Sequence, residues 1–223
     1  MTNTSIEATV PTPDNDATDQ ASGTQVPADA SPVEYSAGVV RLGNIHPEAP
    51  AQEEATPDIT DKGDEDLDKK SFADFGVTDP IVDALEDKGI THPFPIQALT
   101  LGPALDRHDI IGQAKTGTGK TLGFGIPVLE DVIAPDEEGY EDLLNPNKPQ
   151  ALIILPTREL TKQVAQDLRD AAKYLSTRIV EIYGGVAFEP QIEALTRGAD
   201  IVVGTPGRLI DLLRQGHLHL SGV

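Results

Sequence analysis

The pattern of apolar and polar residues changes abruptly near Ser71. Residues 1–70 show neither the two-residue period of a strand nor the 3.6-residue period of a helix, and they hold almost no large apolar side chains. Ordering a backbone costs roughly 1–2 kcal/mol per residue, and this segment has little apolar surface to offset that cost. We therefore expect residues 1–70 to form a disordered, acidic N-terminal tail, and residues 71–223 to form the folded part.

Two helices are expected at the start of the folded part. In "DPIVDALEDKG", Ile81, Val82 and Leu85 share one helical face, and the closing glycine suits the residue that follows a helix. The next apolar segment, "PIQALTLGPALD", begins with Pro95, and proline is favoured in the first turn of a helix. A helical region therefore precedes the first strand.

Four short apolar runs follow, and each is followed by a segment with a helical pattern. The runs are Asp109–Ala114, Ala151–Pro156, Arg178–Gly184 and Asp200–Thr205, and the helical segments are Gly119–Ile133, Arg158–Leu175, Phe188–Arg197 and Pro206–Gln215. Strands that alternate with helices are typical of βαβ units. The sequence thus predicts an α/β, doubly wound fold with a parallel sheet covered on both faces. The acidic stretch Ala134–Gln150 interrupts this order and is expected to be an exposed loop.

The segment "AKTGTGKT" lies between the first predicted strand and its helix, with the spacing of a phosphate-binding loop. Its glycines allow a tight turn, and the helix N-terminus adds partial positive charge. Lys120 would reach the β- and γ-phosphates of ATP, and the Thr121 hydroxyl would ligate Mg²⁺. A flexible Gly/Thr turn is the alternative, but such a match arises by chance in roughly one chain in a hundred at average composition. We predict nucleotide binding by Ala114, Lys115, Thr116, Gly117, Thr118, Gly119, Lys120 and Thr121, the last two being catalytic.

Further motifs surround this loop in a fixed order: "GITHPFPIQ" precedes it, and "PTREL", "YGG" and "TPGRL" follow. The set resembles the first RecA-like domain of a DEAD-box ATP-dependent RNA helicase, over about Phe72 to Val223. Ala114, where the general loop motif has glycine, points to the same branch of NTPases. The resemblance implies a RecA-like P-loop domain with a parallel sheet, ATP and Mg²⁺ as cofactors, and RNA as partner.

"GITHPFPIQ" resembles the Q motif of this family, which would span about residues 70–98, with Phe72 as an isolated aromatic residue upstream. A glutamine amide matches the neighbouring donor and acceptor of adenine. The resemblance therefore implies that Gln97 selects ATP over GTP and that Phe72 belongs to the site. Ile90 stands where the family commonly has an aromatic residue that stacks on adenine, so we expect a weaker affinity for the base.

The three downstream motifs each follow an apolar run, at the sheet edge where open α/β folds bind their ligands. They resemble the family's motif Ia and two other RNA-contact elements. Arginine forks suit phosphates, and contacts to the sugar–phosphate chain carry no sequence preference. Helix capping and surface charge are the alternative for Arg158 and Thr205 taken singly. The resemblance implies sequence-independent RNA binding by Thr157, Arg158, Gly184, Gly185, Thr205 and Arg208.

Composition limits the kinds of partner and binding site that the chain can have. The net charge is -20, and residues 71–223 alone hold 22 acidic and 13 basic side chains, so any nucleic-acid contact must be local. The absence of cysteine excludes disulfides and thiolate metal sites. His217 and His219 lack further ligand-type neighbours, so we expect no metal site there. With no signal peptide and no apolar run longer than Ala151–Leu155, we expect a soluble, cytoplasmic protein without a membrane partner.

The carboxylates that an ATPase needs are not found where the fold would place them. Such an enzyme holds Mg²⁺ and positions the attacking water with acidic residues that follow an apolar strand. Asp136–Glu138 instead follows a predicted helix, and the chain up to Val223 holds no Asp-Glu-Ala-Asp segment. We expect part of an ATP-dependent RNA helicase that binds ATP and RNA but is catalytically incomplete by itself. A non-hydrolysing nucleotide- or RNA-binding remnant and a P-loop DNA helicase are the alternatives.

Overall fold

The structure is a computed structural model that describes residues 69–223 and, by their backbone, the strands at 39–42 and 58–59. The strands are β1 (Val39–Leu42), β2 (Asp58–Ile59), β3 (Ile110–Gln113), β4 (Ala151–Ile154), β5 (Ile179–Ile182) and β6 (Ile201–Gly204). The helices are α1 (Asp79–Glu86), α2 (Pro95–Leu105), α3 (Lys120–Asp131), α4 (Arg158–Ala171), α5 (Glu189–Arg197) and α6 (Pro206–Arg214), with short 3₁₀ turns η2 (Ala73–Phe75) and η3 (Tyr140–Asp142). No helix in this described part is long and apolar enough to cross a membrane.

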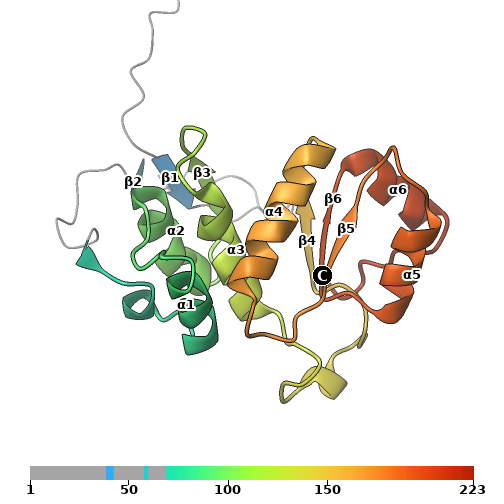
Figure 1. Cartoon of the computed structure of the whole chain (residues 1–223), viewed down its shortest axis with the longest axis horizontal. Helices are drawn as coiled ribbons and strands as arrows, with labels where there is room; N and C mark the ends of the chain where they lie inside the picture. The colour runs from blue at the N-terminus through green and yellow to red at the C-terminus, as the bar shows by residue number, and fades with distance from the viewer. Residues whose placement is uncertain (1–38, 43–57, 60–68) are drawn as a thin grey trace, which may run out of the picture. The chain divides into compact units, whose positions relative to one another are not determined.

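A parallel sheet with strand order β4-β6-β5 forms the centre of the second half of the chain (Figure 1). All four residues of β6 are buried, because helices cover both faces of the sheet. Ile201 and Val203 pack into the core cluster that includes α4. Val202 points to the other cluster, which includes residues of α5 and α6. This arrangement confirms the predicted α/β fold, since continuous apolar strands are typical of parallel sheets covered on both sides.

The strand before the phosphate loop lies in a different sheet. β3 pairs antiparallel with β1, with Val40 opposite Gly112, and β1 pairs antiparallel with β2. β1 and β2 are short strands within residues 1–70, where no strand was predicted. The other residues up to 68 lie outside the described part. Backbone groups of β3 require partners, and the β-branched pair at the start of "VVRL" favours an extended strand.

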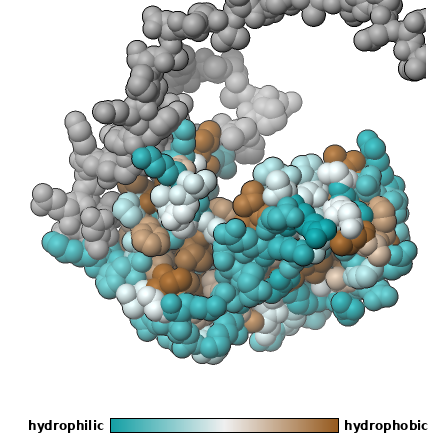
Figure 2. All heavy atoms as spheres, turned by 45° about the horizontal axis from the view of Figure 1, so that its top comes forward, coloured by the Kyte–Doolittle hydropathy of each residue, from teal (hydrophilic) through white to brown (hydrophobic). Residues whose placement is uncertain are grey.

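One edge of β3 and one edge of β4 have no strand partner among the described residues. Ile111 in β3 and Ile154 in β4 are each 58% exposed. In the space-filling view, apolar patches interrupt the hydrophilic surface of the described part (Figure 2). An unpaired edge that carries exposed apolar side chains is a place where a sheet can accept a further strand.

The predicted first helices are confirmed as α1 and α2, and α1 is tied to α4 by charge. The Lys88 Nζ atom lies 2.6 Å from Asp170 Oδ2, and Lys173 Nζ lies 2.5 Å from Asp87 Oδ2. Hydrogen bonds from the lysines, and from Tyr174 to Asp87, lower the pKa of both carboxyl groups. The end of α1, which leads into the Q-motif segment, is therefore fixed on the second half of α4.

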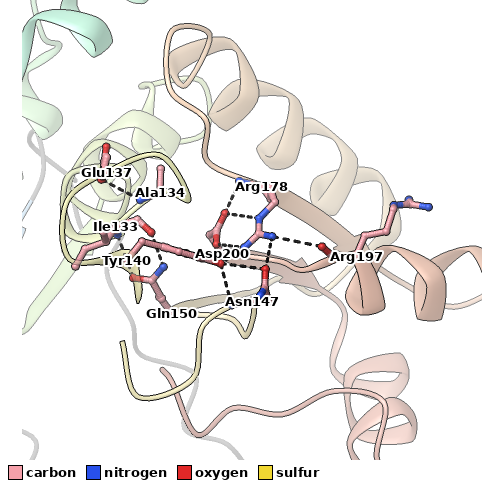
Figure 3. A network of polar contacts seen from close by, with 9 residues as sticks. All are labelled: Ile133, Ala134, Glu137, Tyr140, Asn147, Gln150, Arg178, Arg197 and Asp200. Carbon is pink, nitrogen blue, oxygen red and sulfur yellow. Dashed lines mark hydrogen bonds and ion pairs between the residues drawn. The ribbon is translucent and has the colours of Figure 1, made fainter. Parts of the chain in front are cut away.

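The acidic stretch 134–150 is anchored to the sheet, although it was predicted to be an exposed loop. Its acidic side chains are exposed, but Tyr140 is only 4% exposed. The Tyr140 hydroxyl accepts hydrogen bonds from the Asn147 backbone N–H (2.8 Å) and from Arg178 (2.5 Å) (Figure 3). Arg178 also forms an ion pair with the fully buried Asp200 at the start of the sheet. A buried tyrosine that finds polar partners explains why this loop is held in place.

Candidate functional site

A cleft of about 640 Å³ lies between the phosphate loop, the segment before α2, and one face of α4. This volume is in the range typical of pockets for small ligands. The α4 residues in its wall recur at helical spacing, so one face of that helix is turned towards the loop. The lining residues that matter below are Ile90, Phe94, Gln97, Gly119, Lys120, Thr121, Asp167 and Asp170.

The phosphate loop has the local geometry that the sequence predicts. Gly117 and Gly119 have φ values of 82° and 72°, in the left-handed region that favours glycine. α3 begins at Lys120, so the partial positive charge of its N-terminus lies at the loop. The Lys120 ammonium donates to the carbonyl oxygens of Ala114 (2.7 Å) and Lys115 (2.5 Å). The lysine thus holds the loop closed, with its charge placed where an anion would bind.

Gln97 joins the Q-motif segment to the phosphate loop. Its side chain is 1% exposed; Nε2 donates to the Gly119 carbonyl at 2.7 Å, and Oε1 accepts from the Phe94 backbone N–H at 2.8 Å. A Cβ atom at Gly119 would collide with the Gln97 amide, so the two segments touch directly. In this structure both ends of the amide are engaged with the protein, which fixes the loop relative to α2.

The aromatic residues near the cleft are arranged differently from the sequence-based expectation. Phe72 is 1% exposed within the core cluster and does not line the cleft. Phe94, which sequence reasoning did not select, lines the cleft and is 57% exposed. Its exposure follows from its place as the cap before α2, directly ahead of Pro95. The cleft therefore presents an aromatic face close to Ile90.

Oxygen-bearing side chains meet at the start of α3. Asp167 of α4 lies beside Thr121, and burial raises the pKa of the Asp167 carboxyl while its hydrogen bond with the Thr121 hydroxyl opposes that rise. Across the described residues, no group of three or more His, Cys, Asp or Glu side chains is arranged to hold a metal ion. Hydroxyl and carboxylate oxygens nevertheless suit Mg²⁺, which usually takes few protein ligands beside substrate phosphates.

The predicted RNA-contact motifs meet at the carboxyl edge of the parallel sheet. Thr157, Gly184 and Thr205 follow the neighbouring strands β4, β5 and β6. Thr157 and Thr205 are the residues before α4 and α6, and the Thr157 hydroxyl accepts from the Leu160 N–H at 3.3 Å. Two helix N-termini, each with partial positive charge, therefore open onto one edge of the sheet.

Arg158 belongs to a small cationic group at this edge. Its guanidinium lies 5.8 Å from the centre of the Tyr183 ring, and Lys162 Nζ lies 5.5 Å from the same ring. A Cβ atom on Gly185 would lie 3.7 Å from Arg158 Nη1, so the "GG" turn adjoins the group. Sequence reasoning missed Lys162 and Tyr183; the i, i+4 spacing of Arg158 and Lys162 on one helix was the available signal.

Arg208 is engaged by the protein itself. It is 8% exposed, and its guanidinium lies 3.8 Å from the Phe188 ring centre. Nη2 donates to the Val186 carbonyl at 2.9 Å, and Nη1 donates to the Ala187 carbonyl at 3.4 Å. Both carbonyls belong to the loop that follows Gly185. Arg208 therefore fixes the shape of the "GG" loop from the neighbouring helix.

Comparisons with known proteins agree with this geometry. The family model described as DEAD/DEAH box helicase matches residues 94–223. The chain is 47% identical over 161 residues to DEAD-box ATP-dependent RNA helicase 3B, chloroplastic, of Zea mays, covering 72% of this chain and 21% of that protein. It is 42% identical over 158 residues to ATP-dependent RNA helicase RhlB of Proteus mirabilis, covering 70% of this chain and 36% of that protein.

A solved structure shows the same fold. The crystal structure of a DEAD box protein from the hyperthermophile Methanococcus jannaschii superimposes with a TM-score of 0.58 at 36% sequence identity. The match covers 69% of this chain and 39% of that one. The chain spans about a fifth of the length of the maize relative. The matched region includes the phosphate loop and all three motifs that follow it.

Proposed function

Because the chain belongs to the DEAD/DEAH-box helicase family, we propose that it carries the ATP-binding site and part of the RNA-binding surface of an ATP-dependent RNA helicase. Residues 71–223 would be part of the first RecA-like domain, with the Q motif at about 70–98 and the acidic tail before it. Hydrolysis of ATP and unwinding of RNA belong in this proposal to the whole protein. The observation that carries it is the phosphate loop held in the cleft by Gln97, with Lys120 at its centre.

The phosphates of ATP would bind at the loop. The backbone N–H groups of residues 114–121 and the N-terminus of α3 supply donors and partial positive charge. Lys120 would exchange its two carbonyl partners for phosphate oxygens, which are stronger acceptors for an ammonium group. The loop then opens around the ligand, while Gln97 keeps Gly119 in place.

The base would lie on the Q-motif side of the cleft. The Gln97 amide matches adenine by its donor and acceptor, and beside its bonds to Phe94 and Gly119 it keeps a second lone pair on Oε1 and a second N–H on Nε2. Ile90 and the exposed ring of Phe94 offer apolar surface for the base. Phe94 thus supplies an aromatic face that the chain lacks at Ile90, whereas Phe72 supports the site from the core.

Mg²⁺ fits the oxygen donors of the cleft. Thr121 would hold the ion together with the phosphates, and the ion would neutralise the charge between the β- and γ-phosphates. Mg²⁺ keeps several waters and takes few ligands from protein, so one hydroxyl and the phosphates are enough for the ion to bind with the nucleotide.

RNA would bind at the carboxyl edge of the parallel sheet. Thr157, Thr205 and the "GG" turn present hydroxyl and backbone groups, and the side chain of Arg158 is 44% exposed. Lys162 adds a second cation beside Tyr183. Arg208 is largely buried and donates to two carbonyls of the loop after Gly185, so it would act on RNA through the loop that it holds. Contacts of this kind read the sugar–phosphate chain and not the base sequence.

Replacement of Arg158 by alanine is expected to weaken binding of a single-stranded RNA oligonucleotide and to reduce its dependence on salt. Removing one phosphate contact lowers the slope of log affinity against log salt by about 0.7 to 1. Fluorescence anisotropy at several salt concentrations measures this slope. Arg214→Ala, which removes an exposed cation from α6, is the matched control. An unchanged slope in Arg158→Ala would remove Arg158 from the RNA surface.

The proposed activity is tested in the whole protein that contains this chain. We expect phosphate release from ATP that rises when RNA is added, and loss of this release in Thr121→Val, which lacks the hydroxyl. Hydrolysis that is unaffected by RNA would contradict the helicase assignment. The expected cytoplasmic location stays a prediction.

A further inference from the structure

A tyrosine at the carboxyl edge of the parallel sheet contacts two cations of α4. Tyr183 directly follows β5, and its ring centre lies 5.8 Å from the Arg158 guanidinium and 5.5 Å from Lys162 Nζ. Cations at such distances are attracted to the face of an aromatic ring. Lys162 forms no ion pair within 4.0 Å among residues 69–223, and Arg158 lies 4.0 Å from the exposed Glu159, a weak contact in water. One ring therefore gathers two exposed cations.

The backbone of Tyr183 is fixed by a buried side chain of α5. Gln191 is 7% exposed, and its Oε1 accepts a hydrogen bond from the Tyr183 N–H at 3.0 Å. Its Nε2 donates to the carbonyl oxygens of Tyr183 at 3.3 Å and Ala187 at 3.0 Å. A single amide can make all three bonds, because it carries an acceptor oxygen and two N–H donors. The Tyr183 ring is thus presented from a backbone that is held at both of its polar groups.

The helix that carries the two cations is fixed on the same strand. Late in α4, Arg169 Nη1 lies 2.5 Å from Glu181 Oε1, and Nη2 donates to the Ile179 carbonyl at 3.2 Å. Glu181 and Tyr183 are alternate residues and therefore lie on the same face of the sheet, towards α4. The charge of Glu181 is paired with Arg169, at the other end of α4 from the two cations. The position of α4 along β5 is therefore set at both ends.

We propose that Tyr183 is a positioning residue that holds Arg158 and Lys162 as a two-cation site for one phosphate group of an RNA strand. The inference rests on the proposed RNA-binding function. Side chains four residues apart on a helix are neighbours, so both cations can reach oxygens of the same phosphate. A Cβ atom on Gly185 would lie 3.7 Å from Arg158 Nη1, so the "GG" turn adjoins this site. Side chains that are held before binding lose less conformational freedom when the ligand arrives.

Stacking of an RNA base on the Tyr183 ring is the other role that an aromatic residue could have at this edge. The ring is only partly exposed, and two cations already lie against it. A base would have to displace at least part of this arrangement, whereas a phosphate would bind to it as it stands. The contacts therefore favour the positioning role.

The test measures binding of a fluorescein-labelled oligouridine to the 223-residue chain by anisotropy at several salt concentrations. Lys162→Ala should lower the slope of log affinity against log salt by about 0.7. Tyr183→Leu keeps both charges, so the slope should stay while affinity falls by about 5- to 10-fold, because two side chains must then be ordered on binding. Tyr183→Phe keeps the ring and should restore the affinity. Tyr174→Leu is the matched control, because its ring also lies beside a lysine, Lys173 at 4.7 Å, beyond the end of α4.

A combined variant separates positioning from stacking. When Arg158 and Lys162 are both alanine, Tyr183→Leu should cause no further loss, because the ring has no cation left to hold. A further loss of the same size would overturn the inference and assign the ring to base stacking.

Two other results would also overturn the inference: wild-type affinity in Tyr183→Leu, or an unchanged salt slope in Lys162→Ala. Lys162 is exposed, so its variant decides the point even where Tyr183→Leu does not fold. If the unmodified chain does not bind the oligonucleotide at low salt, the proposed RNA-binding function itself fails, and this inference fails with it.

Discussion

Replacing Lys120 by alanine is expected to weaken binding of Mg²⁺-ATP to the 223-residue chain by about 2–4 kcal/mol, which is about 30- to 700-fold. The ammonium group is the cation at the centre of the phosphate loop, where it donates to the carbonyls of Ala114 and Lys115. Its removal takes away the ammonium group that would face the β- and γ-phosphates. Competition with a fluorescent ATP analogue measures the loss.

A second lysine separates this effect from a general loss of positive charge. Lys148→Ala removes a cation from the acidic stretch, which does not line the cleft, and its affinity for ATP should stay within about twofold of wild type, the range of surface substitutions. The thermal midpoint of Lys120→Ala should match that of the wild type, since Lys120 forms no ion pair among the described residues. Equal affinities for ATP in the two variants would show that the loop is not the phosphate site.

Arg178→Ala is expected to lower the free energy of unfolding by about 3–5 kcal/mol. Asp200 is fully buried, and Arg178 donates to it from Nη2 (2.7 Å), Nε (3.0 Å) and the backbone N–H (2.7 Å). Hydrogen bonding to Asp200 raises the pKa of Arg178. Without the guanidinium, a buried carboxylate loses its counter-charge, and Tyr140 loses a partner (Figure 3).

An exposed arginine supplies the control for this prediction. Arg107 forms an ion pair with Asp131 in which the side chains are 77% and 54% exposed. Exposed pairs contribute about 0–1 kcal/mol, so Arg107→Ala should change stability little. Urea denaturation followed by circular dichroism compares the two variants. Similar midpoints for both would mean that the network around Asp200 does not hold the acidic stretch on the sheet.

The parts of the fold that depend on local pattern were predictable from sequence. Runs such as the one that forms β6 are apolar at every position, as a strand covered on both faces requires. The phosphate loop was predictable because its glycines, lysine and threonine follow one another at fixed spacing. The helix after β4 ends at Ala171, earlier than the predicted Leu175, because apolar periodicity does not specify where the last turn frays.

The parts that depend on long-range contacts were not predictable. The pairing of β1 with β3 joins segments far apart in the chain, and nothing in the tail's composition points to it. Asp167 and Thr121 line the same cleft because α3 packs against α4, with a close approach between Gly125 and Leu168. Arg208 suits phosphate by its chemistry, but its donors meet carbonyls of a loop from another βα unit. None of these three long-range contacts can be predicted from the spacing of residues along the sequence.

The most direct test of the central claim is isothermal titration of the unmodified 223-residue chain with Mg²⁺-ATP and, separately, with Mg²⁺-GTP. The phosphate loop and Gln97 together predict saturable binding of ATP and an affinity for GTP that is weaker by about tenfold or more, because the guanine edge mismatches the amide. Absence of binding by both nucleotides, or equal binding of both, would contradict the account.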